Sequence, residues 1–178
     1  RSTEPGCINN CGVLRVYNTT FYKNSAFWWA GAIHTHGGGN TSLYESTFID
    51  NVAGWNGGAL YTYSYLQIYN STFIGNNCTT NNGGGVYADG DDLSIFESTF
   101  KGNNATNGAG AYVEGHGTEV SRSKFESNNV TNQGGALFVD GSDAYFSNNN
   151  FTNNEAYPTE GSLVAGLGGA IFVIGDNT

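Results

Sequence analysis

The chain has 178 residues, which is enough for one domain with a hydrophobic core. Its formal charge is −9 with only six Lys and Arg residues, which argues against nucleic-acid binding. The sequence contains no run of 18 apolar residues, so it predicts no membrane-spanning helix. Aromatic residues make up 14% of the chain, whereas disordered chains are poor in them. We therefore expect a single folded domain over residues 1–178. Because the sequence opens at Arg1 and contains no Met, we expect a processed chain or a segment of a longer protein.

Six copies of the motif Phe-x-x-Asn recur in phase along the chain, and their Phe residues are 27, 25, 27, 25 and 26 residues apart. The pairs are Phe21 with Asn24, Phe48 with Asn51, Phe73 with Asn76, Phe100 with Asn103, Phe125 with Asn128, and Phe151 with Asn154. A repeat of this length is one supersecondary unit that buries its apolar face against its neighbours.

Two further apolar stretches accompany each Phe. The stretch before it alternates, with anchor pairs at Leu14/Val16, Thr41/Leu43, Leu66/Ile68, Leu93/Ile95, Thr118/Val120 and Ala144/Phe146. The stretch after it follows two or three small residues and is anchored at Ile33, Leu60, Val86, Tyr112, Leu137 and Ile171, with a loop insertion from Tyr157 to Leu167 before the last. Gly, Asn, Ser and Asp separate the stretches, as expected for turns between strands.

Three short strands per repeat of about 26 residues predict an all-β chain, a single parallel β-helix of six to seven coils without a helical cap. Equivalent residues of successive coils then lie about 4.8 Å apart. The six Phe residues should form a buried stack, and the six Asn residues a hydrogen-bonded ladder at a corner.

The combination of Phe-x-x-Asn with Gly-Gly-Ala-aliphatic resembles the repeats of the chlamydial polymorphic membrane proteins. The clearest matches are Gly57-Gly58-Ala59-Leu60, Gly134-Gly135-Ala136-Leu137 and Gly168-Gly169-Ala170-Ile171, and the resemblance covers nearly the whole chain. It implies a right-handed β-helix displayed at a cell surface as an adhesin. The chain departs from that family because it has no outer-membrane barrel segment and carries sites for N-glycosylation.

Seven Asn-x-Ser/Thr sequons are present. Asn77, Asn104 and Asn129 share one phase, four residues after a motif Phe, so they should form one exposed column. Asn18 and Asn70 share another phase, Asn40 stands alone, and Asn150 is the poorest candidate because it overlaps the core motif. N-glycans on these residues would place the protein outside the cell, whereas the alternative is that they only form turns.

Three cysteines fit a secreted protein only loosely. Cys7 and Cys11 can form a disulfide if the three residues between them turn. Cys78 lies three coils further along, about 14 Å away by rung spacing, which exceeds disulfide reach. We expect Cys78 to be free or bonded to another chain.

Candidate chemistry is sparse. Asp91 and Asp92, followed by His116 in Gly-His-Gly, resemble elements of the polygalacturonases, in which paired carboxylates cleave a glycosidic bond. Two other elements of that family are missing, so catalysis is the alternative hypothesis. Asp89, Asp91 and Asp92 offer a weak Ca²⁺ site, and no other metal or cofactor is predicted.

Aromatic residues outside the predicted core are candidates for contact with sugars or with a partner chain. Trp28 and Trp55 coincide in phase, Trp29 is adjacent, and Tyr61 and Tyr87 follow buried aliphatic residues and should face outward. The alternative is that these rings only stack on one another.

Together these observations predict a non-enzymatic, extracellular, N-glycosylated β-helix. It would stack head to tail in a surface fibre or be displayed as an adhesin segment, with a carbohydrate or cell-surface ligand as partner. The alternatives are a polysaccharide-acting hydrolase or lyase, and a carbohydrate-binding module.

Overall fold

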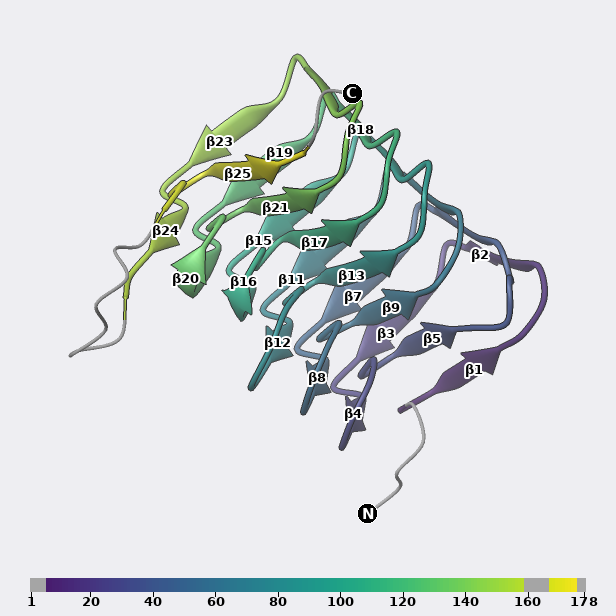
Figure 1. Cartoon of the computed structure of the whole chain (residues 1–178). Helices are drawn as coiled ribbons and strands as arrows, with labels where there is room; N and C mark the ends of the chain where they lie inside the picture. The colour runs from purple at the N-terminus through teal and green to yellow at the C-terminus, as the bar shows by residue number, and fades with distance from the viewer. Residues whose placement is uncertain (1–5, 159–166, 176–178) are drawn as a thin grey trace.

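The computed structural model describes residues 6–158 and 167–175, and over these residues the chain winds into a tube of stacked coils (Figure 1). All pairings between strands are parallel, and the strands form one sheet of seven strands and three sheets of six. No helix of the described residues is long and apolar enough to cross a membrane. The predicted parallel β-helix is therefore confirmed.

Each coil contributes one strand to each of four sheets, which we call A, B, C and D. Sheet A holds β1 (Ile8–Asn10), β5 (Ile33–Thr35), β9 (Leu60–Thr62), β13 (Val86–Asp89), β17 (Ala111–Glu114), β21 (Leu137–Asp140) and β25 (Ile171–Ile174). Sheet B holds β2 (Leu14–Tyr17), β6 (Thr41–Tyr44), β10 (Leu66–Tyr69), β14 (Ser94–Phe96), β18 (Glu119–Ser121) and β22 (Tyr145–Ser147). Sheet C holds β3 (Thr20–Tyr22), β7 (Thr47–Ile49), β11 (Thr72–Ile74), β15 (Thr99–Lys101), β19 (Lys124–Glu126) and β23 (Asn150–Thr152). Sheet D holds β4 (Ser25–Ala26), β8 (Val52–Ala53), β12 (Asn77–Cys78), β16 (Asn104–Asn107), β20 (Asn129–Gln133) and β24 (Glu155–Ala156).

The six motif Phe residues form the predicted stack in sheet C. Consecutive rings are nearly parallel, with centroids 4.6 to 5.0 Å apart from Phe21 to Phe151. The rings of the four middle coils are fully buried. The register matches residue to residue because each coil returns the same side chain to the same face.

The motif Asn residues form the predicted ladder at the corner between sheets C and D. The amide nitrogen of Asn76 donates to Oδ1 of Asn103 at 3.0 Å, and the backbone N–H of Asn76 donates to the same oxygen at 2.9 Å. The side chain of Asn76 also donates to the carbonyl of Phe48. Equivalent bonds run from Asn24 to Asn154, so the buried amides are satisfied at every coil.

Two expectations about the coil were wrong. The structure has four strands per coil rather than three, because the short segment after each motif Asn also pairs with its neighbours. Tyr112 is not in register with Val86 and Leu137; Ala111 is, while Tyr112 pairs with Tyr87 and Phe138. The spacing from Val86 to Ala111 is 25 residues, so a constant period of 26 misplaces one residue here.

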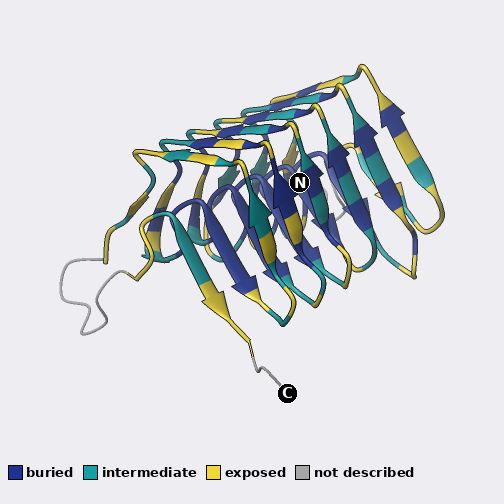
Figure 2. Cartoon of the chain, turned by 90° about the horizontal axis from the view of Figure 1, so that it is seen from above, coloured by how far each residue is buried: buried dark blue, intermediate teal, exposed yellow. Residues whose placement is uncertain are grey.

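Burial is concentrated in the middle coils, as Figure 2 shows. Core residues of the last coil, such as Phe146 and Phe151, are only partly buried. Sheet A contains one strand more than the others, because β25 begins a further coil above β21.

An aromatic groove as the candidate functional site

Sheet D is the part of the tube that positions the candidate site. Its inward column consists of small residues, among them Ala53, Cys78 and Ala105, which are buried. Its outward column starts with Ser25 and Val52 and continues with the sequon residues Asn77, Asn104 and Asn129. The small inward residues let the segments after β4 and β8 lie close to the tube.

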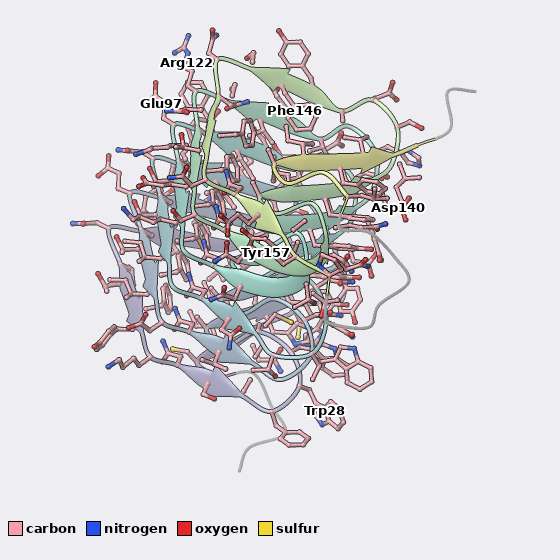
Figure 3. The ribbon with its side chains drawn as sticks, turned by 90° about the vertical axis from the view of Figure 1, so that its left-hand side faces the viewer. Trp28, Glu97, Arg122, Asp140, Phe146 and Tyr157 are labelled. Carbon is pink, nitrogen blue, oxygen red and sulfur yellow. The ribbon has the colours of Figure 1, made fainter. Side chains whose placement is uncertain are left out.

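A groove of about 850 Å³ runs along the outside of the first three coils at sheet D. Phe27 and Trp28 follow β4 in the first coil, Trp55 follows β8 in the second, and Thr80 and Asn81 follow β12 in the third. Figure 3 shows Trp28 projecting from the coils at the N-terminal end. The groove is lined by Ser25, Ala26, Phe27, Trp28, Val52, Gly54, Trp55, Thr79, Thr80 and Asn81, with no charged side chain among them.

The rings of the groove touch at their edges and leave apolar surface open. Phe27 meets Trp28 edge to face at 87°, and Trp28 meets Trp55 at 45° with centroids 5.1 Å apart. Phe27 and Trp55 are 48% and 42% exposed. Exposed indoles in a concave, uncharged surface are a suitable contact for the apolar faces of a sugar.

Hydrogen bonds from the third coil hold the groove in shape. Thr79 and Thr80 both donate to the carbonyl of Gly54. The Asn81 side-chain oxygen, in the orientation that satisfies both of its atoms, accepts from Nε1 of Trp55. The Cys78 thiol donates to the carbonyl of Trp55, and burial raises the pKa of this thiol to about 11. Trp55 is thus held by the third coil, and its backbone N–H also donates to the carbonyl of Trp28 in the first coil.

The predicted contact residues divide into two groups. Trp28 and Trp55 line the groove, but Trp29 does not, because it pairs with Asn56 and lies over His34 on sheet A. Sequence reasoning missed Thr79, Thr80 and Asn81 as groove residues. Aligning the segments that follow β4, β8 and β12 would have placed them beside the Trp residues.

Tyr61 and Tyr87 face outward as predicted, but the structure favours the alternative in which these rings pack on one another. These rings lie on the outer face of sheet A but are only 4% and 5% exposed, because they stack in one column with Tyr112 and Phe138. Burial raises the pKa of Tyr87, and the neighbouring Glu114 carboxylate adds to the effect. No ring face of Tyr61 or Tyr87 is left open to a sugar.

His34 continues this aromatic column toward the N-terminal end. Its ring stacks on Tyr61 at 5.3 Å and is 7% exposed. Its Nε2 is buried without a hydrogen-bond partner among the described residues. Burial, with a contribution from His36, lowers the pKa of His34 to about 4.

An acidic row beside the aromatic column was missed. Asp89, Glu114 and Asp140 are in register on β13, β17 and β21. Glu114 lies in this row because the coil from Val86 to Ala111 is 25 residues long.

The residues that resemble polygalacturonase elements lie at the turn after sheet A, beside a second hollow of about 580 Å³. They are Asp91, Asp92 and His116. Oδ1 of Asp91 accepts from the backbone N–H of His116 at 2.8 Å, and Nδ1 of His116 accepts from the backbone N–H of Ser142. Asp92 adopts a left-handed backbone, with φ of 60°. The structure therefore brings Asp91 and His116 together, and each side chain accepts a hydrogen bond from the backbone of the turn in the next coil.

No group of three His, Cys, Asp or Glu residues in the described part of the chain has the geometry to hold a metal ion. Asp89, Asp91 and Asp92 are not such a group, and the weak Ca²⁺ site considered for them stays a prediction. Asp89 belongs to the acidic row of sheet A, whereas Asp91 is used at the turn.

The predicted disulfide between Cys7 and Cys11 does not form. The residues between them are the extended strand β1 rather than a turn, and four extended steps separate the two Cα atoms by about 13 Å, beyond disulfide reach. Both thiols are free and exposed, and Sγ of Cys11 lies 3.5 Å from Nε2 of His36. Cys78 is also free, but buried.

The sequon column has the predicted geometry. Asn77 pairs with Asn104, and Asn104 pairs with Asn129, so the three lie on consecutive rungs of sheet D. Asn104 and Asn129 are exposed and Asn77 is partly exposed. Asn18 and Asn70 occupy equivalent left-handed corners, with φ of 44° and 42°. The remaining sequon residues, Asn40 and Asn150, are also exposed.

Four parallel sheets wound into a tube, with buried columns of stacked side chains, define the chain as a parallel β-helix protein that carries an aromatic groove. A family model described as the right-handed beta helix region matches residues 7–178. The chain therefore belongs to the right-handed β-helix family. No curated protein and no solved structure matches it.

Proposed function

We propose that this β-helix is a non-enzymatic, extracellular rod displayed as an adhesin segment, and that it binds neutral carbohydrate through the aromatic groove. The observation that carries the proposal is the pair of partly open indoles, Trp28 and Trp55, in an uncharged groove with hydroxyl and amide groups beside them. The likeness of the repeats to the chlamydial polymorphic membrane proteins supports display at a cell surface.

The groove suits sugars because an aromatic face contacts the C–H surface of a pyranose, while Thr and Asn side chains can exchange hydrogen bonds with its hydroxyl groups. Rigid indoles lose little conformational entropy on binding. The neighbouring coils supply the rigidity, since Trp55 is hydrogen-bonded to Cys78 and Asn81 of the third coil and to Trp28 of the first.

A glycan array probed with unglycosylated chain, followed by titration calorimetry, tests the proposal. Trp28→Ala and Trp55→Ala should weaken binding of the selected sugar at least tenfold. Trp29→Ala is the matched control, because Trp29 is 39% exposed, adjacent in sequence and outside the groove. Unchanged binding by both groove variants, or equal loss with Trp29→Ala, would contradict the proposal.

Head-to-tail stacking into a fibre is a second proposal, supported by the two ends of the Asn ladder. At one end Oδ1 of Asn24 accepts no hydrogen bond within the described part of the chain, and at the other the backbone N–H of Asn154 donates none. These groups are complementary between copies. However, β25 already fills the rung of sheet A that β1 of the next copy would occupy, so one of the two must leave its place.

A further inference from the structure

We propose that an N-glycan on Asn77 folds into the aromatic groove and competes there with external carbohydrate, so that occupancy of this one sequon regulates binding. The inference rests on the proposed function of the groove and extends it to the covalent sugar of the chain itself.

Position is the first argument. Asn77 pairs with Val52 in sheet D, so the two side chains point to the same outer face one rung apart, and Val52 lines the groove. Thr79, which completes the sequon of Asn77, also lines the groove. The first sugar attached to Asn77 would therefore lie at the edge of the groove.

The other sequons of the column are placed less well. Asn104 is one rung and Asn129 two rungs further along sheet D, which adds about 4.8 and 9.6 Å to the path. Toward the N-terminal coils, the outward column of sheet D continues from Asn77 to Val52 and Ser25, which are groove residues. Asn77 is thus the sequon at the boundary between the glycan column and the aromatic surface.

Chemistry is the second argument. The inner residues of an N-glycan are N-acetylglucosamines, which are neutral and have an apolar face and an acetamide group. The groove is uncharged, and its volume of about 850 Å³ lies within the range of small-ligand sites. Phe27, Trp28 and Trp55 offer ring surface to the apolar face of the sugar, while Thr80 and Asn81 add a hydroxyl and an amide to the lining.

Tethering is the third argument. A sugar attached one rung from the groove has an effective concentration in the millimolar range, so it occupies the groove most of the time if its Kd for the groove is well below a millimolar. A soluble sugar of the same chemistry must displace it. Glycosylated and unglycosylated forms of the same chain should therefore differ in affinity for external carbohydrate.

The test uses chain secreted from a eukaryotic host as wild type, Asn77→Gln and Asn104→Gln, with unglycosylated wild type for comparison. All forms carry Trp29→Phe, so that the remaining indoles are those of the groove. Mass spectrometry first establishes occupancy at each sequon. Acrylamide quenching of tryptophan emission and titration with soluble β-1,4-linked N-acetylglucosamine oligomers are then compared.

We expect Asn77 to be glycosylated, and Asn77→Gln to raise the quenching constant about twofold and the affinity for the oligomer at least tenfold. Asn104→Gln should match the wild type, and unglycosylated chain should match Asn77→Gln. An unoccupied Asn77, or equal quenching in Asn77→Gln and wild type, overturns the inference. Equal oligomer affinity in those two forms also overturns it, and assigns the groove to a separate ligand.

The two proposals fail in different ways. If no form of the chain binds external sugar, the proposed adhesin function fails, and the quenching comparison alone then decides whether the glycan of Asn77 lies in the groove. If external sugar binds unglycosylated chain and Asn77 remains unmodified, only the regulatory inference fails.

Discussion

At the scale of single residues, the Asn ladder accounts for the repeated motif. Each Asn side chain donates to a backbone carbonyl inside the corner and to Oδ1 of the Asn in the next coil, and that oxygen also accepts the backbone N–H of the first Asn. A coil therefore cannot shift without breaking several buried hydrogen bonds. The partner at each rung is another Asn, which explains why no other residue replaces it in the six repeats.

Asn103→Ala should lower the free energy of unfolding by about 2–4 kcal/mol, because it removes the donor to Phe73 and leaves buried groups of Asn76 unpaired. Urea denaturation of unglycosylated chain measures this loss. Asn104→Ala is the adjacent control, exposed and outside the ladder, and should change the free energy by less than about 0.5 kcal/mol. Equal losses in the two variants would contradict the role of the ladder.

His34 should make the fold sensitive to pH. Its pKa is lowered to about 4 in the folded chain against about 6.5 when unfolded, so the unfolded state alone takes up a proton between these values. Stability is therefore complete above pH 6.5 and should fall by on the order of 2–3 kcal/mol as pH drops to 4. Denaturation midpoints measured at pH 7, 6 and 5 check this window.

His34→Phe is the control for that titration, because Phe occupies the same column at Phe138 and Phe172. The variant should keep the carboxylate titration of the chain but lose the component between pH 6.5 and 5. A wild type and variant with parallel pH profiles would show that His34 does not carry the effect.

At the scale of elements, the columns of sheets B and C followed from the sequence, whereas parts of sheets A and D did not. A Phe or Ile every 25 to 27 residues predicts a column of buried side chains, because one large apolar residue recurs at the same position of each coil. Sheet D is built from Ala, Cys and Asn in segments of two to five residues, which resemble turns, so its strands and the groove behind them were missed. The repeat also predicts the aromatic column of sheet A. The burial of these rings depends on flanking side chains, which the spacing of the repeat does not identify.

Cys78 provides a probe for the opening of sheet D. Because its thiol is buried and its pKa is raised to about 11, alkylation at pH 8 should modify Cys7 and Cys11 rapidly, and Cys78 only when β12 separates from its neighbours. Peptide mass mapping during a time course with iodoacetamide measures the three rates. Comparable rates at all three thiols would contradict the packing of this sheet.

At the scale of the whole molecule, the unequal sheets bear on the proposed end-to-end association. If β1 were absent, β2 of one copy could pair with β22 of the next and β5 with β25, which would continue all four sheets without a gap. The strand β1 therefore acts against continuous stacking, as a protected edge does in other β-proteins.

Deleting residues 1–11 should promote filaments, detected as concentration-dependent sedimentation. In that variant Tyr22→Cys and Thr152→Cys should form disulfides between copies, because the joint would place β3 on β23 with these residues paired. The full chain with the same two substitutions should cross-link far less. A truncated chain that stays monomeric at high concentration would contradict the proposal of head-to-tail stacking.

Stacked coils bring Trp28 and Trp55 together in one groove, which we propose as the sugar-binding site. The most direct measurement is magnetisation transfer by nuclear magnetic resonance between a sugar selected on the glycan array and the indole protons of unglycosylated chain. The account predicts transfer to the indoles of Trp28 and Trp55 and none to Trp29. Transfer to Trp29 alone, or equally to all three indoles, would contradict it.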